Sequence, residues 1–95
     1  MKENKFQSNL INKLKTMFPE CLVLKNDANY KQGIPDLLIL YKDKWAVLEC
    51  KRSSSASKQP LQDYYISLMN EMSFGAIIFP DNEEVVLNNL RNFFV

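Results

Sequence analysis

Two neighbouring segments, 34–41 and 45–51, are apolar on both faces of a predicted β-strand. Side chains alternate between the faces of a sheet, and both segments place apolar residues at odd and at even positions. Only residues 42–44 separate them, which predicts a hairpin. Strands of this kind belong in the middle of a sheet that is covered on both sides. The chain is therefore expected to place helices on both faces of a sheet.

The flanking residues predict the other elements. Phe6, Leu10 and Leu14 recur at helical spacing, and Pro60 suits the first turn of a helix. In chain order we expect a helix over 3–17, a strand over 21–25, the two hairpin strands, a helix over 59–72, a strand over 74–79 and a C-terminal helix that begins at Asp81 with Glu84 completing a capping box. The predicted order αβββαβα indicates one α/β domain over 1–95, with a mixed sheet.

Composition limits the class of protein. The 95 residues are 46% apolar and 24% charged, as in ordinary globular domains. No apolar run is long enough to cross a bilayer, and the first residues contain no secretory apolar region, so we expect an intracellular, cytoplasmic protein without membrane contact. Cys21 and Cys50 lie in apolar strand-like runs, which favours reduced, packed thiols over a disulfide.

The charged and titratable residues limit the chemistry. The chain has no histidine, which excludes Ser-His-Asp catalysis and imidazole metal ligands. Residues 1–58 hold eleven Lys or Arg against six acids, whereas residues 59–95 hold one against five. This asymmetry fits a positive face for a polyanion, and it fits equally well a solvated surface with a chance imbalance.

Three charges interrupt the two apolar strands. Glu49 and Lys51 share one face of the second strand because side chains alternate with a period of two. A hairpin that turns between residues 42 and 43 places Asp36 opposite Glu49. Two carboxylates and one ammonium are therefore expected within a few ångströms of each other at one end of the sheet.

This cluster has a chemical and a structural interpretation. Adjacent carboxylates repel unless a proton or a cation lies between them, and Mg²⁺ is typically held by one or two carboxylates. With Lys51 holding the attacking water or a phosphate oxygen, the group suits phosphodiester hydrolysis. Alternatively, Asp36 caps the entry to its strand, and Glu49 pairs with Lys51 at an exposed strand end.

The same residues resemble a known family. Gly33-Ile34-Pro35-Asp36 and Leu48-Glu49-Cys50-Lys51-Arg52 are similar to the signature of the PD-(D/E)xK nucleases, and specifically of their VRR-NUC branch, the virus-type replication-repair nucleases. The stretch from Glu3 to Ser8 resembles the opening helix motif of that branch, and Gln62 with Tyr65 resembles the motif on its later helix. The resemblance covers about residues 3–79.

The resemblance implies a restriction-endonuclease-like core and a metal-dependent DNA nuclease. It implies that Asp36, Glu49 and the backbone carbonyl of Cys50 bind Mg²⁺ or Mn²⁺, that Lys51 is catalytic, and that Glu3 supports the metal. Short stand-alone members are similar to homodimeric Holliday-junction resolvases of phage or bacterial genome processing, which act on branched DNA in recombination and repair without a small-molecule cofactor. Lys25-Asn26 and Ser53 depart from residues frequent in the branch, which leaves the substrate preference open.

Other residues have a supporting interpretation and a simpler one. Gln7 and Gln62 would support the site, but either would also suit a solvated helix face, and Glu3 in a first helical turn is favourable without any metal. The candidate DNA contacts are Lys31, Lys42, Lys44, Arg52 and Lys58; each would also be stable as a solvated charge. Two other functions remain open: a nuclease of restriction, flap or single-strand specificity, and a non-catalytic DNA-binding subunit.

Overall fold

The computed structural model describes residues 2–57 and 59–95, and its elements follow the predicted order. They are α1 (Glu3–Met17), β1 (Leu22–Lys25), β2 (Leu37–Tyr41), β3 (Lys44–Cys50), α2 (Pro60–Met72), β4 (Phe74–Ile78) and α3 (Glu83–Phe94). The strands form one sheet in the order β1-β2-β3-β4, with β3 and β4 parallel and the other neighbours antiparallel. The predicted mixed sheet, with the two apolar strands at its centre, is confirmed.

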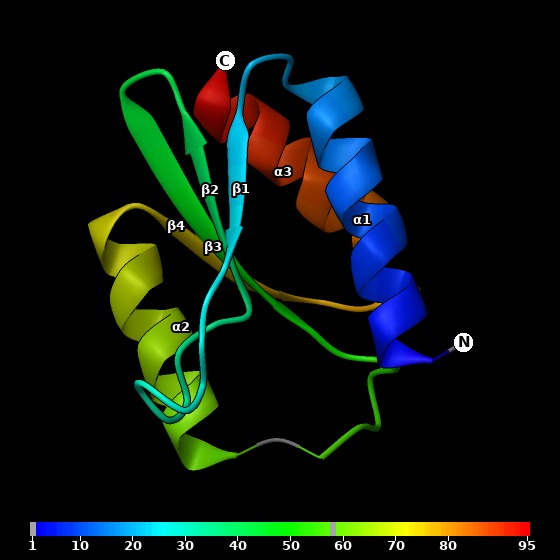
Figure 1. Cartoon of the computed structure of the whole chain (residues 1–95), viewed down its shortest axis with the longest axis vertical. Coiled ribbons are helices and arrows are strands. Elements are labelled where there is room, and N and C mark those ends of the chain that lie inside the picture. The colour runs from blue at the N-terminus through cyan, green and yellow to red at the C-terminus, as the bar shows by residue number, and fades with distance from the viewer. Residues whose placement is uncertain (1, 58) are drawn as a thin grey trace.

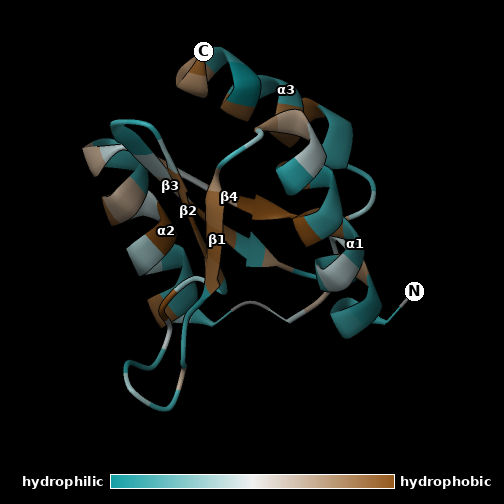
Figure 2. Ribbon diagram, turned by 45° about the horizontal axis from the view of Figure 1, so that its top comes forward, coloured by the Kyte–Doolittle hydropathy of each residue, from teal (hydrophilic) through white to brown (hydrophobic). Residues whose placement is uncertain are grey.

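Helices lie on both faces of the sheet, as predicted (Figure 1). α1 and α3 lie on one face of the sheet (Figure 2). They enclose the main core together with apolar side chains of β2, β3 and β4. α2 lies on the other face, against β3 and β4. Gly75 makes this packing possible, because a Cβ at that position would lie 2.9 Å from the Ile66 carbonyl oxygen. The close approach places the first turns of α2 near the end of β3.

The hairpin strands differ from the prediction at their ends. β2 begins at Leu37 rather than at residue 34, because Pro35 has no N–H and the N–H of Asp36 donates to the side chain of Glu49. The turn holds only two residues between paired positions, and Lys42 adopts a left-handed φ of 58°. β3 therefore begins and ends one residue earlier than predicted, and Lys51 follows the strand.

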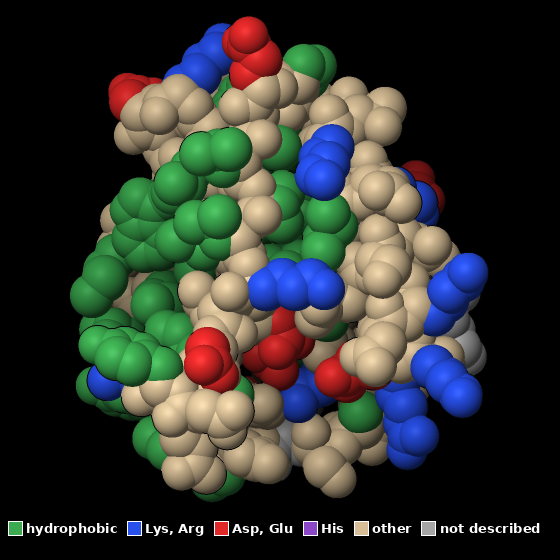
Figure 3. Space-filling model, viewed as in Figure 1, with side chains coloured by type: hydrophobic (Ala, Val, Ile, Leu, Met, Phe, Trp, Pro, Cys, Tyr) green, Lys and Arg blue, Asp and Glu red, His purple; other side chains and the backbone are tan. Residues whose placement is uncertain are grey.

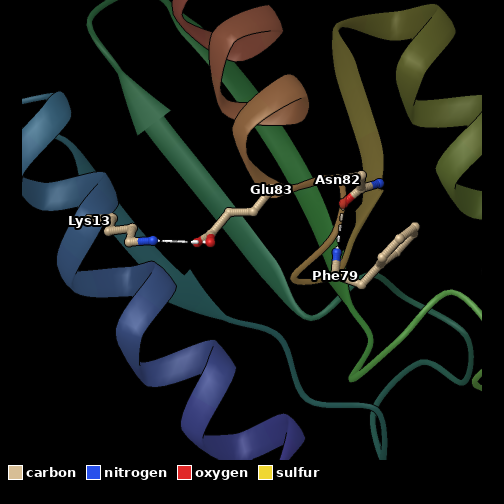
Figure 4. Close-up of polar contacts among 4 residues, drawn as sticks. All are labelled: Lys13, Phe79, Asn82 and Glu83. Carbon is tan, nitrogen blue, oxygen red and sulfur yellow. Dashed lines mark hydrogen bonds and ion pairs between the residues drawn. The ribbon is translucent and has the colours of Figure 1, made fainter. Parts of the chain in front are cut away.

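The predicted capping box of α3 is wrong. The N-cap is Asn82, and neither Asp81 nor Glu84 serves in the predicted cap. The side chain of Asn82 instead bonds back to the residues around the end of β4. Its Oδ1 accepts from the N–H of Phe79 at 2.8 Å (Figure 4). Its Nδ2 donates to the Ile77 carbonyl at 3.0 Å. The side chain thus holds the β4–α3 connection rather than the first turn of the helix.

Apolar contacts join α1 to α3. The ring of Phe18 packs edge-on against Phe94 with centroids 5.1 Å apart. Lys13 and Glu83 add an ion pair at 3.0 Å (Figure 4), which contributes little because the lysine is exposed. None of the described helices is both long and apolar enough to span a membrane.

Candidate active site

The β2–β3 hairpin brings Asp36 and Glu49 together. Leu37 pairs with Leu48, and the same register continues to Asp36 and Glu49, just beyond the last paired residues of β2. The backbone N–H of Asp36 donates to Glu49 Oε1 at 3.2 Å. Both side chains lie on the face of the sheet that α2 covers, because they share the strand parity of Val47. The two carboxylates are thus neighbours, as the sequence predicts.

Backbone hydrogen bonds fix Asp36 on both sides. Its Oδ2 accepts from the N–H of Cys50 at 2.9 Å, and its carbonyl accepts from the N–H of Asn26 at 2.9 Å. The side-chain amide of Asn26 also donates to the Pro35 carbonyl at 2.8 Å. The residues before β2 are therefore held to both neighbouring strands, which orients the carboxylate although Asp36 lies outside the regular strand.

Lys51 is buried beside Glu49 and bonded to α2. Its Nζ donates to Gln62 Oε1 at 2.7 Å and lies 3.5 Å from Glu49 Oε2. Glu49 is 2% exposed and Lys51 is 8% exposed. The alternative interpretation, an ion pair at an exposed strand end, does not agree with this burial. The structure brings Gln62 into the cluster because the first turns of α2 lie over the end of β3.

The electrostatics of the cluster disfavour two unneutralised carboxylates. Burial raises the pKa of Glu49 to about 7, and the negative charge of Asp36 acts in the same direction, while Lys51 opposes both. Burial also raises the pKa of Asp36, against the N–H of Cys50 and the charge of Lys51. One ammonium does not balance two carboxylates, so the site gains from a further cation.

The donor atoms suit a hard divalent cation. Asp36 and Glu49 supply carboxylate oxygens, and the Cys50 carbonyl is the backbone oxygen between Glu49 and Lys51. Residues 2–57 and 59–95 contain no group of three or more His, Cys, Asp or Glu side chains that could hold a metal. Two carboxylates with open positions for water and phosphate match Mg²⁺, which is usually held in this way rather than in an all-protein cage. The residues therefore fit the predicted metal.

Glu3 and Gln7 approach the end of β3 from the α1 side. Burial raises the pKa of the Cys50 thiol to about 12, and the charges of Asp36, Glu49 and Glu3 act in the same direction. A hydrogen bond from the Gln7 side chain opposes this rise. The thiol is therefore protonated and unreactive at neutral pH. Glu3 is exposed and does not group with the two carboxylates. Its support of a metal stays a prediction.

The candidate DNA contacts are divided between the two ends of the sheet. Arg52 is exposed directly after Lys51, and Lys31 lies with its Nζ 5.3 Å from the ring centroid of Tyr65. Lys42 and Lys44 lie at the hairpin turn, about 17 Å along the strand from Glu49. The structure does not bring these two lysines to the site. Lys58 lies outside the described residues.

Further basic residues that the sequence interpretation missed lie near the site. Lys2 and Lys5 are exposed at the start of α1, which lies beside the end of β3 (Figure 1). Figure 3, in the same view as Figure 1, shows acidic side chains set back in the lower half of the molecule, with Lys and Arg side chains around them. Only the neighbourhood of α1 and β3 in the fold identifies these two lysines, because they are remote from Asp36 and Glu49 in the sequence.

The described fold is shared with a solved nuclease-type domain. A structure described as a VRR_NUC domain protein superposes with a TM-score of 0.66, covering 98% of this chain and 88% of that chain at 17% sequence identity. No family model matches the sequence, and no curated protein matches it. A likeness at this identity establishes the fold alone, so the predicted α/β core with a mixed sheet and helices on both faces is confirmed.

The raised pKa of Glu49 predicts a pH dependence of stability. Between its ordinary value of 4.5 and about 7, the folded protein keeps a proton that the unfolded chain has released. The free energy of unfolding should therefore fall as the pH rises through this window, by roughly 2–3 kcal/mol, and Glu49→Gln should remove most of the slope. Urea denaturation in EDTA at several pH values tests this. Equal slopes for the two proteins would contradict it.

Proposed function

We propose that this protein is a metal-dependent endodeoxyribonuclease of the VRR-NUC branch that hydrolyses phosphodiester bonds in branched DNA, in the manner of a Holliday-junction resolvase. The observation that carries the proposal is the cluster of Asp36, Glu49 and Lys51 at one end of the sheet. It lies in a fold shared with a VRR_NUC domain protein. A subunit that only binds DNA has no need for a buried carboxylate beside a half-buried one, an arrangement that costs stability.

Each residue of the cluster has a role in this proposal. Asp36, Glu49 and the Cys50 carbonyl would hold Mg²⁺ or Mn²⁺. When bound, the cation supplies positive charge to the scissile phosphate and favours deprotonation of the attacking water. Lys51, held by Gln62 at 2.7 Å, places an ammonium where negative charge develops in the transition state. Asn26 and the N–H of Cys50 keep the Asp36 carboxylate oriented.

The basic residues near the cluster support a polyanionic substrate. Two carboxylates would repel a phosphate backbone, so cations must surround them if DNA is to approach. Lys2, Lys5, Lys31 and Arg52 are exposed on the elements that converge on this end of the sheet. The basic excess of the first half of the sequence thus lies, in part, around the proposed site.

An apolar face supports the homodimer that paired cuts in a junction require. α2 covers β3 and β4 but leaves β1 and β2 open on the same side. Leu22 and Leu24 are 59% and 45% exposed there, beside Leu38 and Leu40, and α2 itself has no buried residue. Figure 3 shows apolar side chains gathered over β1, β2 and α2. A second copy would cover this face through a twofold axis.

The dimer is expected to depend on this face. Leu22→Asp should yield a monomer at micromolar concentration. The exposed leucine contributes nothing to the core, so the fold should persist, whereas the introduced aspartate would place a buried charge in the interface. Light scattering after size exclusion measures the mass. Val85→Asp is the matched control, since Val85 is 62% exposed on α3, away from this face. A monomeric wild-type protein would argue against junction resolution.

Cleavage of end-labelled DNA tests the proposed function. A four-way junction, a flap, a linear duplex and a single strand would each be incubated with Mg²⁺, with Mn²⁺ and with EDTA. Paired, metal-dependent nicks across the junction are the expected result. Preferred cutting of the flap or the single strand would establish a nuclease of another specificity. Binding without cleavage of every substrate would replace the proposal by a non-catalytic DNA-binding subunit.

A further inference from the structure

The connection between β1 and β2 carries an aromatic ring that packs against almost nothing. Tyr30 is 88% exposed, more than any other large apolar or aromatic residue among the described residues. The connection projects from the body of the molecule (Figure 2), and it ends at Asp36 of the proposed site. A single exposed apolar side chain is ordinary on a protein surface, so the location of this ring, on the connection that leads to the proposed site, is what distinguishes it.

Hydrogen bonds within this connection hold the backbone at Tyr30 in a defined turn. The N–H of Tyr30 donates to the Asp27 carbonyl at 3.1 Å, and the N–H of Asn29 donates to Asp27 Oδ1 at 2.8 Å. Farther along, Gly33 has a φ of +86° and lies so close to α2 that an added Cβ would be 2.6 Å from Leu61 Cβ. The connection is thus held by its own hydrogen bonds at one end and by packing against α2 at the other.

The same connection is hydrogen-bonded to the backbone around Asp36, whose carboxylate belongs to the proposed site. Asn26, at its start, bonds through its backbone N–H to the Asp36 carbonyl and through its amide to the Pro35 carbonyl. A ligand bound at Tyr30 would therefore be held at a set position relative to Asp36. Tyr30 and Asp36 lie on the same short connection, and Asn26 joins the two ends of that connection by its hydrogen bonds.

The surroundings of Tyr30 are basic and hollowed. A cavity of about 280 Å³ is lined by Lys25, Asn26, Asp27, Tyr30, Lys31 and Ile34. Lys25 and Lys31 line the cavity and are both exposed, against one acidic lining residue, Asp27. The Nζ of Lys31 lies 5.3 Å from the ring centroid of Tyr65 on α2, so its charge is at the edge of the cavity that faces α2. An aromatic face combined with cations is the combination that binds unpaired nucleotides, through base stacking and phosphate contacts.

We propose that Tyr30, with Lys25 and Lys31, binds an unstacked base of the DNA next to the cleavage site. The inference rests on the proposed function and deepens it, because it assigns the feature of branched DNA that the protein recognises. A fully paired duplex offers no free base face, whereas a branch or a single-stranded arm does. A protein partner fits less well, since it would have to desolvate two lysines, a residue type depleted in protein interfaces.

Binding to paired and unpaired DNA tests the proposal. Fluorescence anisotropy would measure the Kd of a labelled fork with a single-stranded arm and of a duplex of equal length, with Ca²⁺ in place of Mg²⁺ and probe integrity checked on a denaturing gel. Tyr30→Ala should weaken fork binding about tenfold and leave duplex binding nearly unchanged, while Tyr30→Phe keeps both. Tyr64→Ala is the control, because Tyr64 is an exposed tyrosine on α2 (57%) and does not line the cavity.

Several outcomes would overturn the base site. Unchanged fork binding by Tyr30→Ala would do so, as would equal losses of affinity for the fork and the duplex. A change in the molecular mass of the variant, measured by light scattering, would instead place Tyr30 in a protein interface. Tyr30 is too exposed to support the core, so an unaltered melting temperature should accompany the loss. A wild-type protein that binds neither probe would overturn the proposed function itself. Junction cleavage by wild type with unaltered Tyr30→Ala binding would overturn only the base site.

Discussion

Replacing Asp36 by asparagine is expected to lower metal-dependent DNA cleavage by about a thousandfold, the scale at which one charged contact to the reacting groups is lost. The amide is nearly isosteric, and its oxygen can still accept from the N–H of Cys50, which Asp36 Oδ2 does at 2.9 Å. The fold should therefore persist while the site loses one of its two carboxylate charges. Mg²⁺ or Mn²⁺ is expected to raise the melting temperature of the wild-type protein, and the same change should remove that rise.

Two measurements separate this expectation from a general loss of stability. Single-turnover cleavage of a four-way junction gives the rate, and thermal unfolding with and without the metal gives the shift in melting temperature. Asp43→Asn is the matched control, because Asp43 is exposed in the hairpin turn at the far end of β3. If Asp36→Asn retains both the cleavage rate and the metal-induced shift, the proposed metal site is in the wrong place.

The pairing of Asp36 with Glu49 could be predicted because it is a local property of a hairpin. A period of two along each strand and a turn between residues 42 and 43 suffice to place the two positions opposite each other. The same geometry sends Lys42 and Lys44 to the other end of the strands. Their assignment as DNA contacts therefore concerns the far end of the hairpin, and it stays a prediction.

The bond between Lys51 and Gln62 depends on tertiary structure. The sequence predicts a helix at Gln62, but it does not say over which strand that helix will pack. Gly75 permits the observed packing, since its missing side chain lets α2 approach β4 at the Ile66 carbonyl. Only the resemblance to a family placed Gln62 near the lysine, and the structure now gives the contact at 2.7 Å.

The open face of β1 and β2 could not be predicted from the apolar pattern. Strands that are apolar on both faces predict cover on both sides, and β2 meets this expectation on the side of α1 and α3. On the other side, α2 lies over β3 and β4, and Leu38 and Leu40 remain half-buried. The apolar pattern is equally compatible with cover by the chain itself or by a second copy, so the pattern alone does not distinguish them.

Replacing Lys51 by alanine is expected to lower cleavage by at least about a hundredfold, while folding and DNA binding are largely retained. Removal of a buried ammonium normally leaves its partner with an uncompensated charge. Here Glu49 can take up a proton instead, because its pKa is already raised to about 7 and loses the opposing effect of Lys51. The variant should therefore fold in the absence of metal.

The response to metal distinguishes Lys51 from the carboxylates. Without the ammonium 3.5 Å from Glu49, a divalent cation meets less repulsion, so Lys51→Ala should keep the metal-induced rise in melting temperature or enlarge it. Asp36→Asn should lose it. Lys44→Ala, an exposed lysine at the other end of β3, serves as the control for the loss of one positive charge. Near-normal cleavage by Lys51→Ala would remove this residue from the mechanism. Loss of the metal-induced rise in melting temperature would show that Lys51 is needed to form the metal site, rather than only to stabilise the transition state.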